Sequence, residues 1–552
     1  MVTTHSTSIH PDRISRRVVL GGLAGVGAAT TLAAAGCSTD SGSGSGSGGG
    51  GQQGANQVLP TYQAYEGVTP TYPAEPGRTS AAFESYPADP PRYAEEAPGD
   101  GTPVTFMGPT SFAAPPPLRN NTFWQEMNAR VGSDLDINLT PAGEYDAKFA
   151  TSVAGDQLPD MFYIGGMASL PQFMTSKAAD LTEYLSGDNI LNYPGLANIP
   201  TDSWRECIFD GTIRSVPLNR GLVSLPSILV REDVLAEKGI SSADATDFEA
   251  LYDLSKELTG GDVFAWTGAP TGHIRNMLDI PHTWVLGEDG KLTTSLQDER
   301  QEQALEASRR LVADGLVHPE AAGTPVATRK LWFGSGTGPL HPDSFIAWFS
   351  LYIQNADVEG IEIQALPMAG FNGGQGTQAL PRPNAGRTAI NASAGDRIPT
   401  LLKIADWLAA PTGTEEYRFN KYGVEDHNFT LEGSDPVPTD KADEVNIGSL
   451  YICDAARAIY SPGRPAATQS AWEHQKAVTE KAVEDPTYGL YSETYSRRIT
   501  TLNRALDAVR EDIMAGRKPV SAWKPAAEDF MKKGGTKILE EFQQALDADP
   551  TR

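Results

Sequence analysis

The sequence predicts an α/β protein in which helices cover a parallel sheet. The pattern of strands and helices between residues 104 and 165 supports this prediction. Apolar and polar residues alternate over 104–108, as in a half-buried strand. A helix is expected next, because Phe123 and Val131 fall on one helical face. The runs "LDINLT" (135–140) and "DMFYIG" (160–165) predict two further strands with helical sequence between them. This β-α-β order is typical of parallel sheets covered by helices.

Residues 1–36 have the features of an export signal. Arg16 and Arg17 precede an apolar run over 18–35, which is the pattern of a twin-arginine signal peptide. The run is rich in Gly and Ala, so we interpret it as a cleaved signal and not as a permanent span. "AAGC", ending at Cys37, resembles a bacterial lipobox with Ala34 in place of the usual Leu, which predicts a lipidated Cys37. The alternative is an ordinary secretory signal with an incidental cysteine.

Residues 37–103 are predicted to form a tether whose two parts differ in flexibility. The Gly/Ser run 41–51 is typical of a flexible coil, whereas the later part interleaves prolines with tyrosines and is expected to be extended and stiffer. Such a tether would hold the folded part away from a lipid surface. In the alternative interpretation, the tyrosines strap this segment onto the folded part.

The net charge, the cysteines and the histidines limit which partners and metal ions the protein can bind. The net charge of -26 disfavours nucleic acid and anionic lipid surfaces, which would be repelled. Cys207 and Cys453 could pair or could be two separately buried thiols. No two of the eight histidines are spaced i, i+4, so the helical H-E-x-x-H zinc motif is absent. We expect no metal and no cofactor.

The rest of the chain, 104–552, is long enough for two domains or one bilobal body. "SILVRE" (227–232) predicts a strand that leads into a helix, and Asp289-Gly290 is interpreted as a hairpin turn. Helices are predicted at 400–410 and over 502–513, where apolar residues recur at helical spacing. The C-terminal third is therefore expected to be mainly helical.

Five groups of segments carry a resemblance to a known family. They are, in order, "GDQLPDMFYIGG" (155–166), "DGTIRSVP" with "ILVREDVLAEKGI" (210–240), "LVADGLVHPE" (311–320), "YGVEDHNFTLEG" (422–433) and "KKGGTKILEEFQQAL" (532–546). Their order and spacing resemble the family 1 extracellular solute-binding proteins, which are sugar-binding lipoproteins of ABC importers. The long, oligosaccharide-type branch is the most similar.

This resemblance implies a type II periplasmic-binding fold, with two α/β lobes, a hinge and a ligand cleft between the lobes. It places 104–217 with about 328–385 in lobe one, and 218–327 with about 386–552 in lobe two. The implied function is to capture a mono- or oligosaccharide outside the cell membrane and deliver it to the permease subunits by hinge closure. We expect a monomer anchored by its lipid.

Candidate ligand-binding residues follow from the chemistry of sugars. A sugar offers apolar C–H faces to aromatic rings and hydroxyl groups to polar side chains. Ligands of open α/β sheets bind at the carboxyl ends of strands. The candidates at strand ends and at the first lobe crossing are Ser111, Phe112, Tyr163, Asn219 and Arg220. Those expected from the second lobe and the later crossing are Trp266, Trp284, His341, Asp343, Trp348 and Trp472.

Each candidate has a structural alternative. A tryptophan can belong to a hydrophobic core, and polar residues near a hinge can hydrogen-bond to one another in place of a ligand. Trp348 is the candidate that we single out as a stacking platform, because it follows the polar run 341–344. Arg275 could counter the negative field locally if the sugar were acidic.

Signals of catalysis are weak in this sequence. "GSGTGP" (334–339) is Gly-rich but lacks the Lys and Ser/Thr of a phosphate-binding loop, and there is no G-x-S-x-G nucleophile elbow. Carboxylates are abundant, which leaves a glycoside hydrolase as one alternative function. A sensory surface lipoprotein is the other. We expect a binding protein and not an enzyme.

Overall fold

The computed structural model describes residues 58–549. They fall within one compact unit, Gln52–Arg552. Cys37, the signal peptide and the Gly/Ser run lie outside the described residues. Within residues 58–549, no helix combines the length and the apolar character needed to cross a membrane.

The first lobe is built on a five-stranded sheet in the order β3-β2-β4-β14-β7. Strands β2, β3 and β4 run parallel, as predicted, while β14 is antiparallel to both of its neighbours. The strands are β2 (Val104–Thr110), β3 (Leu135–Pro141), β4 (Met161–Ile164), β7 (Val216–Asn219) and β14 (Asn384–Ile390). The sheet is therefore mixed: the predicted parallel arrangement of β2, β3 and β4 is confirmed, and β14 adds an antiparallel strand.

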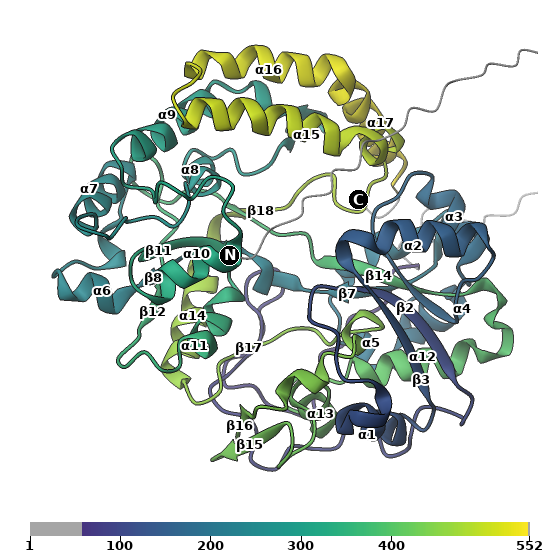
Figure 1. The fold of residues 1–552 in the computed structure, drawn as a ribbon. Helices are drawn as coiled ribbons and strands as arrows, with labels where there is room; N and C mark the ends of the chain where they lie inside the picture. Colours follow the sequence, from purple (N-terminus) through teal and green to yellow (C-terminus); the bar gives the residue numbers. More distant parts are fainter. Residues whose placement is uncertain (1–57, 550–552) are drawn as a thin grey trace, which may run out of the picture. The chain divides into compact units, whose positions relative to one another are not determined.

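Helices cover both faces of this sheet (Figure 1). Alternating residues of β4 face opposite sides, so Met161 joins one core and Phe162 the other. The helices that pack on the Met161 side are α1 (Thr122–Val131), α5 (Pro194–Ala197), α12 (Ile398–Leu408) and α13 (Glu415–Tyr422). Those on the Phe162 side are α2 (Ala142–Ala154) and α3 (Leu170–Lys177). Cys207 and Cys453 lie in the first of these cores as separate free thiols.

The second lobe is built on a three-stranded antiparallel sheet in the order β11-β8-β12. Its strands are β8 (Pro226–Arg231), β11 (Leu340–Ser344) and β12 (Ile363–Ala365). The Val230 side packs on α6 (Glu232–Glu237), α7 (Phe248–Leu258), α8 (Thr271–Met277) and α9 (Glu299–Ala313). The Leu229 side packs on α10 (Val326–Gly334), α11 (Ala347–Gln354) and α14 (Pro465–Val478).

This pairing differs from the expected division of the chain. We placed 328–385 in lobe one, but β11 and β12 both pair with β8 of the second lobe. We placed 386–552 in lobe two, but β14 and α12 belong to the first lobe. The physical reason is that β8 is buried and needs hydrogen-bond partners on both edges. Apolar patterning along the sequence does not reveal which sheet a strand joins.

The C-terminal helices (Figure 1, yellow) form a separate core together with a hairpin. The helices are α15 (Glu493–Met514), α16 (Trp523–Phe530) and α17 (Thr536–Ala548). The hairpin strands are β9 (Trp284–Leu286) and β10 (Leu292–Thr294). Gly290 has a φ of +75° and its N–H donates to the Gly287 carbonyl, which confirms the predicted turn. The remaining short elements are α4 (Thr182–Leu185), β5 (Ile208–Phe209), β6 (Thr212–Ile213), β13 (Gln378–Ala379), β15 (Phe429–Glu432), β16 (Asp435–Pro438) and β18 (Ala482–Val483).

Residues 58–103 form a strap on the folded unit and not the stiff tether that we expected. Strand β1 (Ala82–Phe83) pairs in parallel with β17 (Ile459–Tyr460). The Tyr86 hydroxyl donates to the Thr414 carbonyl, and the Tyr93 hydroxyl donates to Asp406 at 2.5 Å. Each buried tyrosine combines a large apolar ring with a satisfied hydroxyl group, which explains why a Pro/Tyr-rich segment can pack against the lobes.

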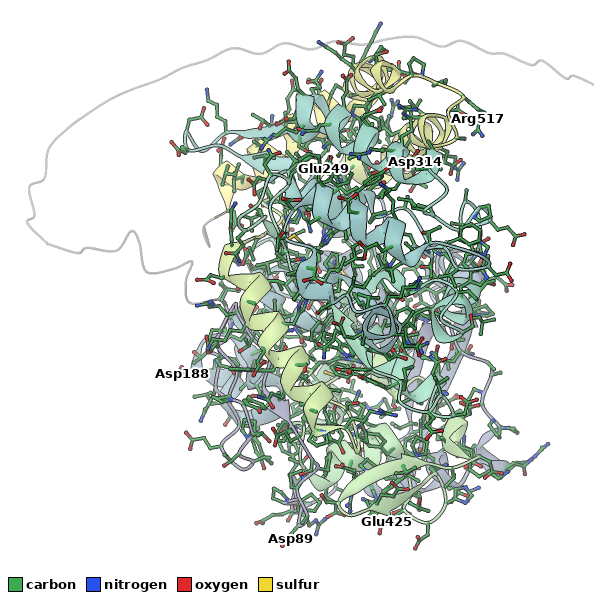
Figure 2. The ribbon with its side chains drawn as sticks, turned by 90° about the vertical axis from the view of Figure 1, so that its left-hand side faces the viewer. Asp89, Asp188, Glu249, Asp314, Glu425 and Arg517 are labelled. Atoms are coloured by element: carbon green, nitrogen blue, oxygen red, sulfur yellow. The ribbon has the colours of Figure 1, made fainter. Side chains whose placement is uncertain are left out.

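The excess of acidic residues is spread over the surface. Figure 2 labels exposed carboxylates on separate elements, among them Asp188, Glu249, Asp314 and Glu425. Like charges that are far apart repel one another little at physiological ionic strength. The labelled carboxylates therefore do not form one acidic site.

Candidate ligand-binding site

Three segments, which we call the crossing segments, carry the chain between the two lobes. They are 220–225 from β7 to β8, 380–383 from β13 to β14, and 454–458 from the first core to β17. The N–H groups of Arg220 and Gly221 both donate to the Pro383 carbonyl, at 2.7 and 2.9 Å. Gly221 reaches this position with a φ of +53°, a conformation that favours glycine. The first two crossing segments are thereby held side by side.

A cavity of about 720 Å³, which we call the crossing pocket, lies against these segments. Its wall also contains residues 198 and 200–203 of the first lobe, residues 484, 485 and 488, and parts of the strap between Tyr62 and Phe83. The volume is in the range typical of small-molecule sites. A molecule held here would touch residues of all three segments that join the lobes, among them Gly221, Arg382 and Arg457.

Polar side chains line the pocket as pairs of donors and acceptors. The Arg382 guanidinium donates to Asp485 at 3.1 Å. Burial alone would raise the pKa of the Asp485 carboxyl, but Arg382 and the hydrogen bonds from Thr487 hold that pKa below its ordinary value. The Asn219 amide donates to the Ser203 hydroxyl at 2.7 Å. The pocket wall therefore carries a charged donor, an ionised acceptor and amides.

A buried ionic cluster lies behind the third crossing segment. Asp454 is 1% exposed and forms ion pairs with Arg220 and Arg457, each at 2.8 Å, and with Lys421. Burial would raise the pKa of the Asp454 carboxyl, but the three cations hold it well below its ordinary value. Arg457 also lines the crossing pocket. The cluster joins the first crossing segment to the third.

The first-lobe candidates occupy different positions around this site. Asn219 lines the pocket, while its neighbour Arg220 joins the ionic cluster. Tyr163 is half-buried, packs edge-on against Tyr451 and donates its hydroxyl to the Ala385 carbonyl at 3.0 Å. Ser111 and Phe112 are exposed at the end of β2 and do not line the pocket; the Phe112 side chain is 50% exposed.

The tryptophans that we expected as sugar platforms lie in hydrophobic cores instead. Trp348 is 0% exposed and packs against Phe345. Trp266 is equally buried and donates its indole N–H to the Ser255 hydroxyl at 2.9 Å, and Trp284 packs against α16 and α17. A buried ring has no free face for a sugar in this structure.

Trp472 and the polar pair from the later crossing also have protein partners. Trp472 is half-buried and stacks on Tyr72 of the strap, with ring centroids 4.9 Å apart. His341 is 0% exposed, with Nδ1 2.7 Å from the Thr267 hydroxyl and Nε2 3.2 Å from Asp343. His341 and Asp343 hydrogen-bond inside the second lobe, and none of Trp472, His341 and Asp343 lines the pocket.

Sequence reasoning missed most of the pocket wall. Tyr62, Tyr65, Arg382, Asp485 and Tyr488 are not among the candidates, yet all five line the cavity. The prolines and tyrosines that alternate along the strap are the one sequence feature that could have indicated a role for this segment in the pocket wall. Across residues 58–549, no group of three or more His, Cys, Asp or Glu side chains is placed to hold a metal ion.

Comparisons with known proteins identify the class of fold. No family model and no curated protein matches the sequence. Among solved structures, the alginate-binding protein AlgQ2, solved without calcium ion, aligns with a TM-score of 0.57 at 14% identity, covering 83% of this chain and 99% of that chain. The N-glycan transport solute-binding protein NgtS from Streptococcus pneumoniae aligns with a TM-score of 0.59 at 16% identity, covering 82% and 100%.

A third structure extends this likeness. An HMO-binding, ABC-transporter-associated solute-binding protein from Bifidobacterium longum infantis aligns with a TM-score of 0.56 at 12% identity, covering 82% of this chain and 100% of that chain. At these identities the comparisons define the fold. The chain has the two-lobed α/β fold of the solute-binding proteins of ABC transporters, which confirms the predicted fold class.

Proposed function

We propose that this protein is an extracytoplasmic solute-binding lipoprotein that captures a mono- or oligosaccharide and delivers it to an ABC importer. The observation that carries the proposal is the crossing pocket, a cavity of about 720 Å³ against the segments that join two lobes of this fold. We assign the protein to family 1, in its long oligosaccharide-type branch, on the segments between 155 and 546 described above.

The chemistry of the pocket favours a carbohydrate. Sugar hydroxyl groups both donate and accept, and Arg382, Asp485 and Asn219 offer both kinds of partner. Tyrosine rings in the same wall suit the apolar face of a sugar ring. The similar solved structures are named for alginate, N-glycan and HMO ligands, which agrees with this class.

Hinge closure is the proposed mechanism of delivery. A ligand in the crossing pocket contacts the crossing segments themselves, so it can bind one arrangement of the lobes more tightly than another. That difference in affinity shifts the population towards the closed form, which the permease subunits would recognise. The protein binds and releases its ligand unchanged and acts as a monomer.

Lipidation of Cys37 is the proposed means of retention at the outer face of the cell membrane. Because Cys37 alone follows an apolar run ending in small residues, Cys37→Ala should release the protein into the medium. Fractionation of cells expressing each form, followed by immunoblotting, measures the effect. A Cys37→Ala protein that remains in the membrane fraction would contradict the anchor.

The ligand class is tested by a thermal-shift screen followed by calorimetry. A sugar at 100 times its Kd should stabilise the protein by about 2.7 kcal/mol. The panel contains kestose, a mannose–N-acetylglucosamine disaccharide, an alginate trisaccharide, amino acids and short peptides. Stabilisation by peptides or amino acids with no response to any sugar would refute the carbohydrate assignment.

A further inference from the structure

We propose that the strap is part of the ligand-binding site and that Tyr62 and Tyr65 supply its aromatic contact surface. This inference rests on the proposed function and assigns a recognition role to a segment that the sequence predicts to be a spacer. It concerns a sugar ring that lies on the strap side of the crossing pocket.

The exposure of the aromatic rings in the pocket wall points to the strap. Four aromatic residues line the described cavity: Tyr62, Tyr65, Phe83 and Tyr488. Phe83 and Tyr488 are buried, at 5% and 4% exposure. Tyr62 is 40% exposed and Tyr65 is half-buried. The aromatic surface that a ligand can reach is thus contributed by residues 62 and 65.

Local contacts hold these two tyrosines in place. The Tyr65 N–H donates to the Asn198 side chain at 3.1 Å, and the Tyr65 ring packs edge-on against Tyr93 with centroids 5.8 Å apart. The Gln63 N–H donates to the Ala197 carbonyl at 2.9 Å. A platform that is ordered before the ligand arrives costs less entropy on binding. The strap therefore presents its rings from a fixed backbone on the first lobe.

The strap continues from these contacts to the second lobe. Tyr72 stacks on Trp472, Glu75 accepts from Lys476 at 2.6 Å, and the Ser80 N–H donates to Gln475 at 2.6 Å. The three partners are all on α14 of the second lobe. The same stretch of chain lines the pocket over Tyr62–Phe83. Ligand contact with the strap consequently involves a wall that is attached to both lobes.

The chemistry of the two walls is complementary. The strap contributes tyrosines, prolines and small residues, whereas the lining residues outside the strap include Arg382, Asp485 and Arg457. A sugar ring has this same division between its C–H face and its hydroxyl groups. We therefore place the C–H face against Tyr62 and Tyr65 and the hydroxyl groups towards Arg382 and Asp485.

The experiment compares ring removal with ring retention in the full chain. The probes are kestose, the mannose–N-acetylglucosamine disaccharide and the alginate trisaccharide, and affinity is measured by calorimetry. The double variant Tyr62→Ala/Tyr65→Ala should bind the responding sugar at least about tenfold more weakly, while Tyr62→Phe/Tyr65→Phe should stay within about threefold of the wild type. Tyr184→Ala, a half-buried tyrosine of α4 outside the pocket wall, is the matched control and should bind normally.

A second measurement needs no variant. Hydrogen exchange of wild-type peptides covering 62–83 should slow when the responding sugar is added, because a sugar that binds only the docked strap makes local opening of this segment rarer. If the double alanine variant binds the sugar as tightly as the wild type, or if the sugar does not change exchange over 62–83, this inference is wrong. The proposed function would still stand. A wild-type protein that responds to amino acids or short peptides but to none of the sugars would overturn the proposed function and this inference with it.

Discussion

Trp266, Trp284 and Trp348 lie in three different hydrophobic cores, whereas Tyr62 and Tyr65 line the crossing pocket. All five are aromatic residues, and the tryptophans are the ones that we expected from the sequence to bind sugar. The structure separates them by burial. Residues of the cores are expected to control folding stability, and residues of the pocket wall are expected to control affinity.

The largest expected effect comes from a core tryptophan. Trp348→Ala removes a fully buried ring beside Phe345, and the cavity that remains should cost about 3 to 5 kcal/mol of unfolding free energy. Sugar affinity of the folded fraction should change little. Urea unfolding without ligand measures the stability, and calorimetry measures the affinity. Phe112→Ala, at an exposed strand end, is the control and should unfold like the wild type. Weakened sugar binding with normal stability in Trp348→Ala would reverse this assignment.

The second expected effect comes from the buried ionic cluster. Asp454→Asn keeps the shape of the side chain but leaves Arg220, Arg457 and Lys421 without their shared counter-charge. Removing one partner of a buried ion pair costs about 3 to 5 kcal/mol, and we expect about 3 because the cations are partly exposed. Urea unfolding measures this loss. Asp512→Asn, which removes a carboxylate shared by Arg517 and Lys518 at the surface, should leave the midpoint nearly unchanged. A midpoint for Asp454→Asn as close to the wild type as that of Asp512→Asn would show that the buried cluster stabilises the fold no more than a surface carboxylate does.

The contact between the strap and the first lobe should depend on pH. Asp406 accepts from the Tyr93 hydroxyl at 2.5 Å and from the Gly195 N–H at 2.8 Å, and burial raises its pKa from 3.8 to about 6. Because the pKa is raised in the folded state, the protonated form is favoured there. This contribution to stability is present below about pH 4 and is lost as the pH rises through 6, by about 2 to 3 kcal/mol.

Substitution isolates that pH dependence from the other carboxylates. Asp406→Asn should flatten the difference in unfolding free energy between pH 4 and pH 8, relative to the wild type. Asp89→Asn, an exposed carboxylate of the strap, should leave the wild-type profile in place. Parallel profiles for Asp406→Asn and the wild type would show that Asp406 titrates normally.

The sequence predicted the first lobe better than the second because of how each sheet is built. Strands β2, β3 and β4 follow one another along the chain with helices between them, so periodicity alone indicates a parallel sheet. In the second lobe, β8 pairs with β11 and β12, which come more than a hundred residues later. Nothing local to 340–344 or 363–365 specifies that pairing, and the predicted lobe boundaries failed there.

The candidate site was predicted only where it adjoins a strand end. Asn219 follows the rule that ligands gather at carboxyl ends of strands, and it lines the pocket. Tyr62 and Arg382 enter the same wall from segments that are 157 and 163 residues away from Asn219 in the chain and carry no binding motif. Their role depends on the docking of the strap and on the course of the second crossing segment, which are tertiary features.

The smallest expected effect tests the polar wall of the pocket. Arg382 is partly exposed and pairs with Asp485 at 3.1 Å, so its ion pair should contribute no more than about 1 kcal/mol to stability. A sugar hydroxyl that accepts from the guanidinium would contribute about 1.5 to 3 kcal/mol, the range for hydrogen bonds to charged groups. Arg382→Gln should therefore weaken sugar binding by about tenfold or more while the urea midpoint moves little. Arg300→Gln removes a similar arginine–aspartate pair, with Asp298, outside the pocket wall and should leave affinity unchanged. If Arg382→Gln lowers stability and leaves affinity at the wild-type value, Arg382 belongs with Trp348 as a residue that maintains the fold, and the sugar contacts other groups.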